Sequence, residues 1–224
     1  MIPIADENKR GFIPFINYLL LFANMAIYFL VQPSGEAQSV AFYNRFGLIP
    51  RQLLLNPLEI QGYASLFTSM FLHGSLLHLL GNMLYLWIFG DNIEHRLGHI
   101  RYLFFYLTVG IGAALGQIII NPYSEIPMIG ASGAISGILG AYLLKYPLNR
   151  VAILFFFFFI IRVIRVPAII VLSMWFFFQV YNGYFHLNTG LTGGVAWFAH
   201  IGGFISGFVL VTFFEAGRKK RNYF

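Results

Sequence analysis

The chain of 224 residues contains no cysteine, so neither a disulfide nor a thiol contributes to its fold or its chemistry. Charged residues are also scarce, at 10% of the chain, whereas 58% of the residues are hydrophobic and the mean hydropathy is +0.74. This balance excludes an ordinary soluble domain and predicts that a lipid bilayer surrounds most of the chain. The net charge of +6 is therefore interpreted through membrane orientation and not as a nucleic-acid footprint.

Acidic and metal-binding patterns are missing as well. The only aspartates are Asp6 and Asp91, and Asp6 lies in the polar N-terminal segment, so a pair of intramembrane aspartates is excluded. No His-Glu-x-x-His motif occurs, and His73 and His78 are five residues apart, roughly 140° around a helix. We therefore expect no metal and no cofactor.

What the chain does contain is a series of apolar segments separated by polar turns. They predict an all-α polytopic membrane protein with one domain over residues 12–214, between tails at 1–11 and 215–224. The long connection over 33–62 is amphipathic, and we expect it to form short helices at the membrane interface. Polar turns or loops are expected at 91–98, 121–128 and 181–192. The six expected spans are 12–32, a segment within 66–90 that begins near Ser75, 101–120, 130–145, 167–180 with its flanks, and 193–214.

The segment 148–166 does not fit a membrane-spanning helix. Its apolar part contains eleven residues, about half the length that a helix needs to cross a bilayer. We expect it to lie at the interface or against the bundle, with its conformation left open.

Orientation follows from the positive charges. With six spans, all of the fourteen lysines and arginines except Arg45 and Arg51 lie on one side, together with both tails. The positive-inside rule then predicts that both termini are cytoplasmic in a cell membrane and that the opposite ends of the helices face outward. A seventh span would place the basic C-terminal cluster outside, which the rule disfavours.

Two polar residues in apolar helices suggest nucleophilic catalysis. Ser132 lies near the start of the segment 130–145, in a Gly-x-Ser-Gly motif. This motif alone indicates helix packing more often than catalysis. His200 lies at a similar predicted depth and would supply the base that a serine nucleophile needs. Small residues repeat on one face of each helix and would permit close approach: Ser132, Ser136 and Gly140 on the first, and His200, Gly203 and Gly207 on the second.

His78 and Asn82, one helical turn apart, are expected at the same depth. Their side-chain N–H groups, with the backbone N–H of Ser132, would stabilise an oxyanion; hydrogen bonding between helices is the alternative. A carboxylate partner for the histidine is not expected, because Asp91 lies about 20 Å along the helix from His78. Glu125 in the outer turn is the one acidic residue that could contradict this expectation. The sequence thus predicts a Ser–His dyad.

These motifs together resemble the rhomboid intramembrane serine proteases of the bacterial six-span type. The resemblance implies that Ser132 is the nucleophile, that His200 is the base, and that His78 and Asn82 are oxyanion donors. It gives His73 a supporting role, with Gly130, Gly133 and Gly203 as motif glycines. The matching segments are His73-Gly74-Ser75-Leu76-Leu77-His78-Leu79-Leu80-Gly81-Asn82-Met83, Gly130-Ala131-Ser132-Gly133, and Ala199-His200-Ile201-Gly202-Gly203 with Gly207.

The resemblance also implies cleavage of transmembrane protein substrates without ATP. Residues 181–192 would then be either a mobile cap or a plain loop, and Trp175 with residues 176–178 either a lateral gate or a lipid-facing surface. Two features depart from some relatives: Ser136 occupies a position where an aromatic stacks on the base, and 33–62 lacks a Trp-Arg pair.

Two other functions are weighed against proteolysis. A non-catalytic rhomboid-like binder or chaperone would use the same bundle without needing Ser132, His200 and Asn82 together. A small transporter would show paired interrupted helices with ionisable residues at mid-membrane. Transmembrane proteins and lipids are the expected partners, and nucleic acid is not.

Overall fold

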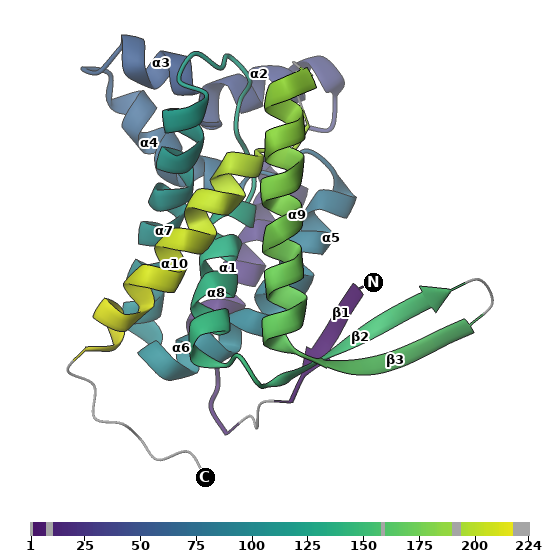
Figure 1. The fold of residues 1–224 in the computed structure, drawn as a ribbon. Helices are drawn as coiled ribbons and strands as arrows, with labels where there is room; N and C mark the ends of the chain where they lie inside the picture. Colours follow the sequence, from purple (N-terminus) through teal and green to yellow (C-terminus); the bar gives the residue numbers. More distant parts are fainter. Residues whose placement is uncertain (1, 8–10, 158–159, 190–193, 217–224) are drawn as a thin grey trace.

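The computed structural model describes residues 2–7, 11–157, 160–189 and 194–216, and side chains 156, 157 and 160 are not described. These residues form a helical bundle with a small sheet at one end (Figure 1). The strands are β1 (Ile2–Asp6), β2 (Arg150–Phe157) and β3 (Ile160–Pro167). The α-helices are α1 (Phe15–Ala26), α2 (Glu36–Phe46), α3 (Pro50–Leu55), α4 (Ile60–Thr68), α5 (Leu76–Tyr85), α6 (Asp91–Leu97), α7 (His99–Ile120), α8 (Ser132–Lys145), α9 (Ala168–Thr189) and α10 (Trp197–Glu215). Three short helical turns are η1 (Ile27–Val31), η2 (Ser69–Phe71) and η3 (Leu86–Gly90).

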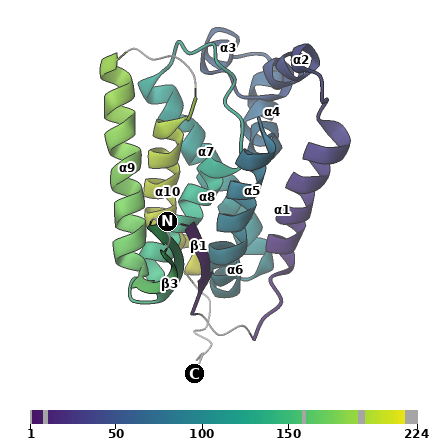
Figure 2. The same ribbon diagram turned by 90° about the vertical axis from the view of Figure 1, so that its right-hand side faces the viewer.

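Helix α8 lies inside the bundle, with α5, α7, α9 and α10 around it (Figures 1 and 2). Its residues are buried without a break from Ala134 to Tyr142. Five of those nine residues are glycine, alanine or serine, so neighbouring helices can approach its backbone closely. The predicted helices over 101–120, 130–145 and 193–214 are confirmed by α7, α8 and α10.

The contact between α8 and α10 is a backbone contact. A Cβ added to Gly203 would lie 2.1 Å from the Gly133 carbonyl oxygen, and one on Gly207 would lie 1.8 Å from that of Gly137. One on Gly140 would lie 2.0 Å from the carbonyl oxygen of Phe204. The expected close approach is therefore correct, but on α8 it uses Gly133 and Gly137 in place of the neighbouring serines.

Three described helices are long and apolar enough to cross a bilayer: α7, α9 and α10. A fourth crossing results if the segments Ile60–Phe71 and Leu76–Leu97, which bend by 80° at their break, are counted as one span. Helix α1 with η1 is apolar but only 17 residues long, and α8 has 14. The six-span count stays a prediction.

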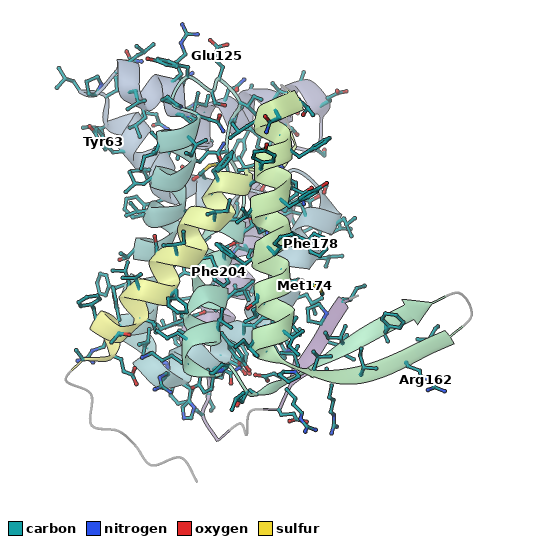
Figure 3. All side chains as sticks on the ribbon, in the orientation of Figure 1. Tyr63, Glu125, Arg162, Met174, Phe178 and Phe204 are labelled. Atoms are coloured by element: carbon teal, nitrogen blue, oxygen red, sulfur yellow. The ribbon has the colours of Figure 1, made fainter. Side chains whose placement is uncertain are left out.

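The connection over 33–62 forms the short helices α2 and α3 and leads into α4. These helices lie at the end of the bundle opposite the sheet (Figures 1 and 2). Figure 3 shows Glu125 at this end and Arg162 on the hairpin at the other. Helix α5 begins directly after Ser75, whose hydroxyl accepts the backbone N–H of His78.

The expectation of an all-α fold is corrected by an antiparallel sheet in the order β1-β2-β3. The segment 148–166 is a hairpin in which Arg150 pairs with Pro167 and Phe157 with Ile160. Its isoleucines, valines and phenylalanines favour strands, and Val151 and Ile153 are buried against the bundle.

Part of the N-terminal tail belongs to this sheet. Ile2–Asp6 pairs with β2, and the Asp6 carboxylate accepts hydrogen bonds from Asn92 Nδ2 at 2.8 Å and from the Tyr142 hydroxyl at 2.7 Å. Residues 2–6 of the predicted tail over 1–11 thus form a strand, and pairing with β2 satisfies backbone groups that a free tail would leave to water. The division into tails and one membrane domain stays a prediction.

The predicted turn over 91–98 is also wrong, since residues 91–97 form α6. Glu94 on this helix is fully buried, and its carboxylate accepts the backbone N–H groups of Ile16 at 2.9 Å and Asn17 at 2.6 Å. These are amides of the first turn of α1, which have no acceptor within their own helix. Glu94, one of the charged residues that suggested a turn, instead caps a neighbouring helix.

The expected loop over 181–192 is helical as far as Thr189, and its remaining residues lie outside the described part. Its polar side chains bond to carbonyls one turn earlier: Asn182 to Phe178 at 2.6 Å and Asn188 to Tyr184 at 2.7 Å. Asparagine usually weakens helices by competing for backbone groups, but these bonds are compatible with the helix.

We expect Glu94→Ala to lower the free energy of unfolding by about 2 kcal/mol, the upper end of the cost of losing a helix cap, because two buried amides lose their acceptor. Thermal unfolding of the detergent-purified protein measures the change. Glu125→Ala is the control, since Glu125 forms an exposed ion pair with Arg51, a kind of pair worth about 0–1 kcal/mol. Equal stability of the two variants would contradict the capping role.

Candidate active site

A cavity of about 1300 Å³ opens between α5, the start of α8, α9 and the start of α10. The residues over 120–129 line its other side. Four of the predicted site residues line it together: His78, Asn82, Ser132 and His200. The fold therefore brings these residues, which are up to 122 positions apart in the sequence, to one chamber.

Ser132 and His200 are in direct contact. Ser132 is the first residue of α8, His200 lies in the first turn of α10, and Ser132 Oγ is 2.8 Å from His200 Nε2. Both side chains are partly exposed to the cavity. The pair has the geometry that lets an imidazole remove the proton of a serine hydroxyl.

Gln179 on α9 is the residue that the sequence prediction missed. Its Oε1 lies 2.8 Å from His200 Nδ1, so both ring nitrogens of the histidine are engaged. Gln179 is only 7% exposed although α9 is apolar. A polar residue buried in such a helix needs a partner, and that rule could have drawn attention to Gln179.

Aromatic contacts to His200 come from two helices. The Trp175 ring on α9 lies 6.0 Å from the imidazole centroid at 36°, and the Trp197 ring on α10 lies 6.3 Å from it and nearly perpendicular. Ser136, where some relatives carry an aromatic, instead donates its hydroxyl to the Ser132 carbonyl at 2.7 Å. The His200 ring is therefore flanked by aromatics without one at position 136.

Asn82 and His78 follow each other along α5. Asn82 is 8% exposed, and its Nδ2 has no hydrogen-bond partner among the described residues. A buried amide without a partner is costly, so its persistence next to a cavity is typical of a donor held ready for a ligand. His78 lies beside Gly130, within reach of the Ser132 end of α8.

His73 packs against His78 and does not line the cavity. It is fully buried, its ring lies 5.2 Å from that of His78, and its backbone N–H donates to Gln32 Oε1 at 2.9 Å. Its carbonyl accepts from Gln32 Nε2 and from the Tyr43 hydroxyl. Burial raises the pKa of Tyr43, which keeps that hydroxyl protonated as a donor. Gln32 and Tyr43 thus fix the chain just before α5, and the sequence prediction did not include them.

The three predicted glycines are required by close packing. Gly130 has φ +122°, a backbone conformation that other residues rarely adopt. A Cβ on Gly133 would lie 2.7 Å from that of Ala113, and Gly203 touches the Gly133 backbone. All three therefore lie where a side chain would disturb the backbone beside Ser132, His78 or His200.

In the described part of the chain, the side-chain partners of His200 are the neutral Gln179 and Ser132, and no charged residue bonds to either Ser132 or His200. Glu125 lines the far side of the cavity and pairs with Arg51. Among the described residues, no three His, Asp or Glu side chains converge as metal ligands would.

Comparison with known proteins shows which family the chain matches. The family model for the Rhomboid domain matches residues 61–216. The chain is 32% identical over 198 residues to Rhomboid protease GluP of Bacillus subtilis (strain 168), covering 87% of this chain and 34% of that protein. It is 33% identical over 145 residues to RHOMBOID-like protein 1 of Arabidopsis thaliana, covering 65% of this chain and 33% of that protein. The chain spans about a third of the length of these relatives.

We expect Gly130→Ala to lower the free energy of unfolding by about 1–3 kcal/mol, because alanine is strained at positive φ. Its Cβ would also lie 2.8–2.9 Å from the His78 ring. Thermal unfolding in detergent measures the loss. Gly74→Ala is the matched control, since its Cβ would meet only Ile129 at 3.6 Å. A Gly130→Ala protein as stable as the control would refute the packing role.

Proposed function

Because the chain belongs to the rhomboid family, we propose that it is an intramembrane serine endopeptidase that cleaves transmembrane segments of other membrane proteins. The observation that carries this proposal is the 2.8 Å contact between Ser132 Oγ and His200 Nε2 in a cavity of about 1300 Å³. A serine in a membrane helix that served packing alone would not need an imidazole aimed at its hydroxyl.

In the proposed reaction, His200 Nε2 takes the Ser132 hydroxyl proton as Oγ attacks the carbonyl carbon of the scissile peptide bond. The resulting imidazolium gives that proton to the leaving amine, and an acyl-enzyme remains on Ser132. Water then attacks the ester, with His200 again accepting and returning a proton. The substrate chain is released as a carboxylic acid and an amine.

The developing negative charge on the carbonyl oxygen needs donors that are already in place. We assign this role to Asn82 Nδ2, a ring N–H of His78 and the backbone N–H of Ser132. The unpartnered Asn82 amide supports the assignment, as does the place of Ser132 at the first residue of α8, where amides lack an intrahelical acceptor.

A substrate helix hides its peptide bonds in its own hydrogen bonds, so it must unwind locally before Ser132 can reach a carbonyl. The cavity has room for such an unwound segment and for the water that hydrolysis consumes. Substrates that unwind easily, with small residues at the cleavage site, are the expected class. On α9, Phe177 and Phe178 are at least half exposed, which fits a surface that meets lipid or an entering substrate.

The proposed orientation has both termini in the cytoplasm and the cavity opening to the outer face of the cell membrane. Arg45 and Arg51 lie at the end of the bundle where α2 and α3 are, whereas β1 and the end of α10 lie at the opposite end (Figure 1). Six further lysines and arginines among the described residues belong to α6, the start of α7, the end of α8 and the hairpin, at that opposite end, which fits the positive-inside rule: Arg96, Arg101, Lys145, Arg150, Arg162 and Arg165.

A fluorophosphonate probe tests the proposal. We expect it to label the detergent-purified protein, and labelling to disappear in Ser132→Ala and in His200→Ala. Cleavage of a single-span model substrate should fall at least 10³-fold in both variants, because the nucleophile and its base act as one unit. Ser173→Ala, which alters an exposed serine on α9, should leave both readouts unchanged.

Retained cleavage in Ser132→Ala would overturn the proposal. A folded protein that is neither labelled nor active on transmembrane substrates, yet still binds them, would instead favour the rhomboid-like binder.

A further inference from the structure

Helix α9 buries a narrow stripe of its surface, and one member of that stripe is polar. The buried residues are Ala168, Leu172, Gln179 and Gly183. The side-chain amide of Gln179 contacts one group on α10 and one on α9. Its Oε1 lies 2.8 Å from His200 Nδ1, and its Nε2 lies 3.3 Å from the Trp175 carbonyl oxygen. Gln179 therefore connects the backbone of α9 to the imidazole on α10.

The chemistry of these contacts determines where the protons are. The Trp175 carbonyl can only accept a hydrogen bond, so the group of the amide that faces it must be the NH₂. The amide oxygen then faces His200 Nδ1, and an oxygen can only accept, so Nδ1 must carry the ring proton. A neutral imidazole protonated on Nδ1 has a free lone pair on Nε2, which lies 2.8 Å from Ser132 Oγ.

We propose that Gln179 is a positioning residue that fixes the proton of His200 on Nδ1 and so leaves Nε2 ready to accept the Ser132 proton. This inference rests on the proposed protease function. In soluble serine proteases an aspartate holds the equivalent nitrogen and keeps the imidazole in the correct tautomer. A neutral amide favours the same imidazole tautomer without placing a charge in the membrane interior, where a carboxylate is costly.

Gln179 belongs to neither of the helices that carry the dyad. The α8–α10 contact fixes the Ser132–His200 distance, whereas the tautomer depends on α9 being packed against α10. Removing Gln179 should consequently leave the dyad helices and substrate binding intact and reduce the fraction of His200 that can act as a base.

The test compares Gln179→Leu with Gln179→Glu and with Asn182→Leu. Asn182 is the matched control, because its side chain makes the same bond to a carbonyl one turn earlier on α9 and does not line the cavity. The kcat and KM of a single-span model substrate are measured, with kcat expressed per Ser132 titrated by the fluorophosphonate probe. Solution or solid-state ¹⁵N spectra of histidine-labelled protein report which ring nitrogen of His200 is protonated.

We expect Gln179→Leu to lower kcat about tenfold, equivalent to about 1.4 kcal/mol, with KM unchanged. Its His200 spectrum should change from the Nδ1–H form to a mixture of both tautomers. Gln179→Glu, whose carboxylate can also accept from Nδ1–H, should recover most of kcat, and Asn182→Leu should behave as the wild type.

The inference is overturned if Gln179→Leu keeps the wild-type kcat and the Nδ1–H spectrum, and that result leaves the protease proposal intact. It is also overturned if Glu at position 179 is as impaired as Leu while the tautomer is unchanged, since the effect would then be structural. Failure of the protease proposal looks different: the wild type itself neither cleaves nor reacts with the probe, whatever residue occupies position 179.

Discussion

The backbone contact between α8 and α10 is the constraint on which the site depends. Where Gly203 and Gly207 meet the carbonyl oxygens of Gly133 and Gly137, a single methyl group would force the helices apart. Ser132 begins one of these helices and His200 lies near the start of the other, so their side chains meet at hydrogen-bond distance only because the helices touch. Helix packing in lipid relies on such small surfaces, since apolar side chains gain little by leaving an apolar solvent.

Buried polar groups follow a second constraint, which is that each must find a partner inside the protein. The Glu94 carboxylate meets the open amides of α1, and Asp6 meets Asn92 and Tyr142. The Asn82 amide and the ring nitrogens of His73 are among the exceptions in the described part of the chain, and of these two residues Asn82 lines the cavity. An unpartnered donor is tolerable where a ligand supplies the missing acceptor, which is possible for Asn82 and not for the enclosed His73 ring.

The sequence allowed the helices and the central pair to be predicted, because apolar length and small-residue spacing are local properties. Ser132 and His200 were singled out because a serine nucleophile needs a base and because their motifs resemble those of a known family, and small-residue spacing predicted their contact. The sheet was not, since β2 reads equally well as a shortened apolar helix until β1 and β3 pair with it. Glu94 and Gln179 were missed for a related reason: a polar residue in a helix reveals that a partner exists, but only the packing of other helices identifies it.

Two kinds of contact therefore position Ser132 and His200: one sets their distance, and the other orients the imidazole ring. The distance between Ser132 and His200 is set by glycine backbones, which cannot be compressed and allow one spacing only. The orientation of the His200 ring is set by Gln179 and Trp175 on α9, a helix with exposed phenylalanines on its outer side. A helix that contacts the bundle through a narrow stripe can shift more easily than α8, which is buried along its length. If Ser132 and His200 act as proposed, α9 can shift without changing the distance between them, and the contact of Gln179 with His200 is the part of the site that such a shift would alter.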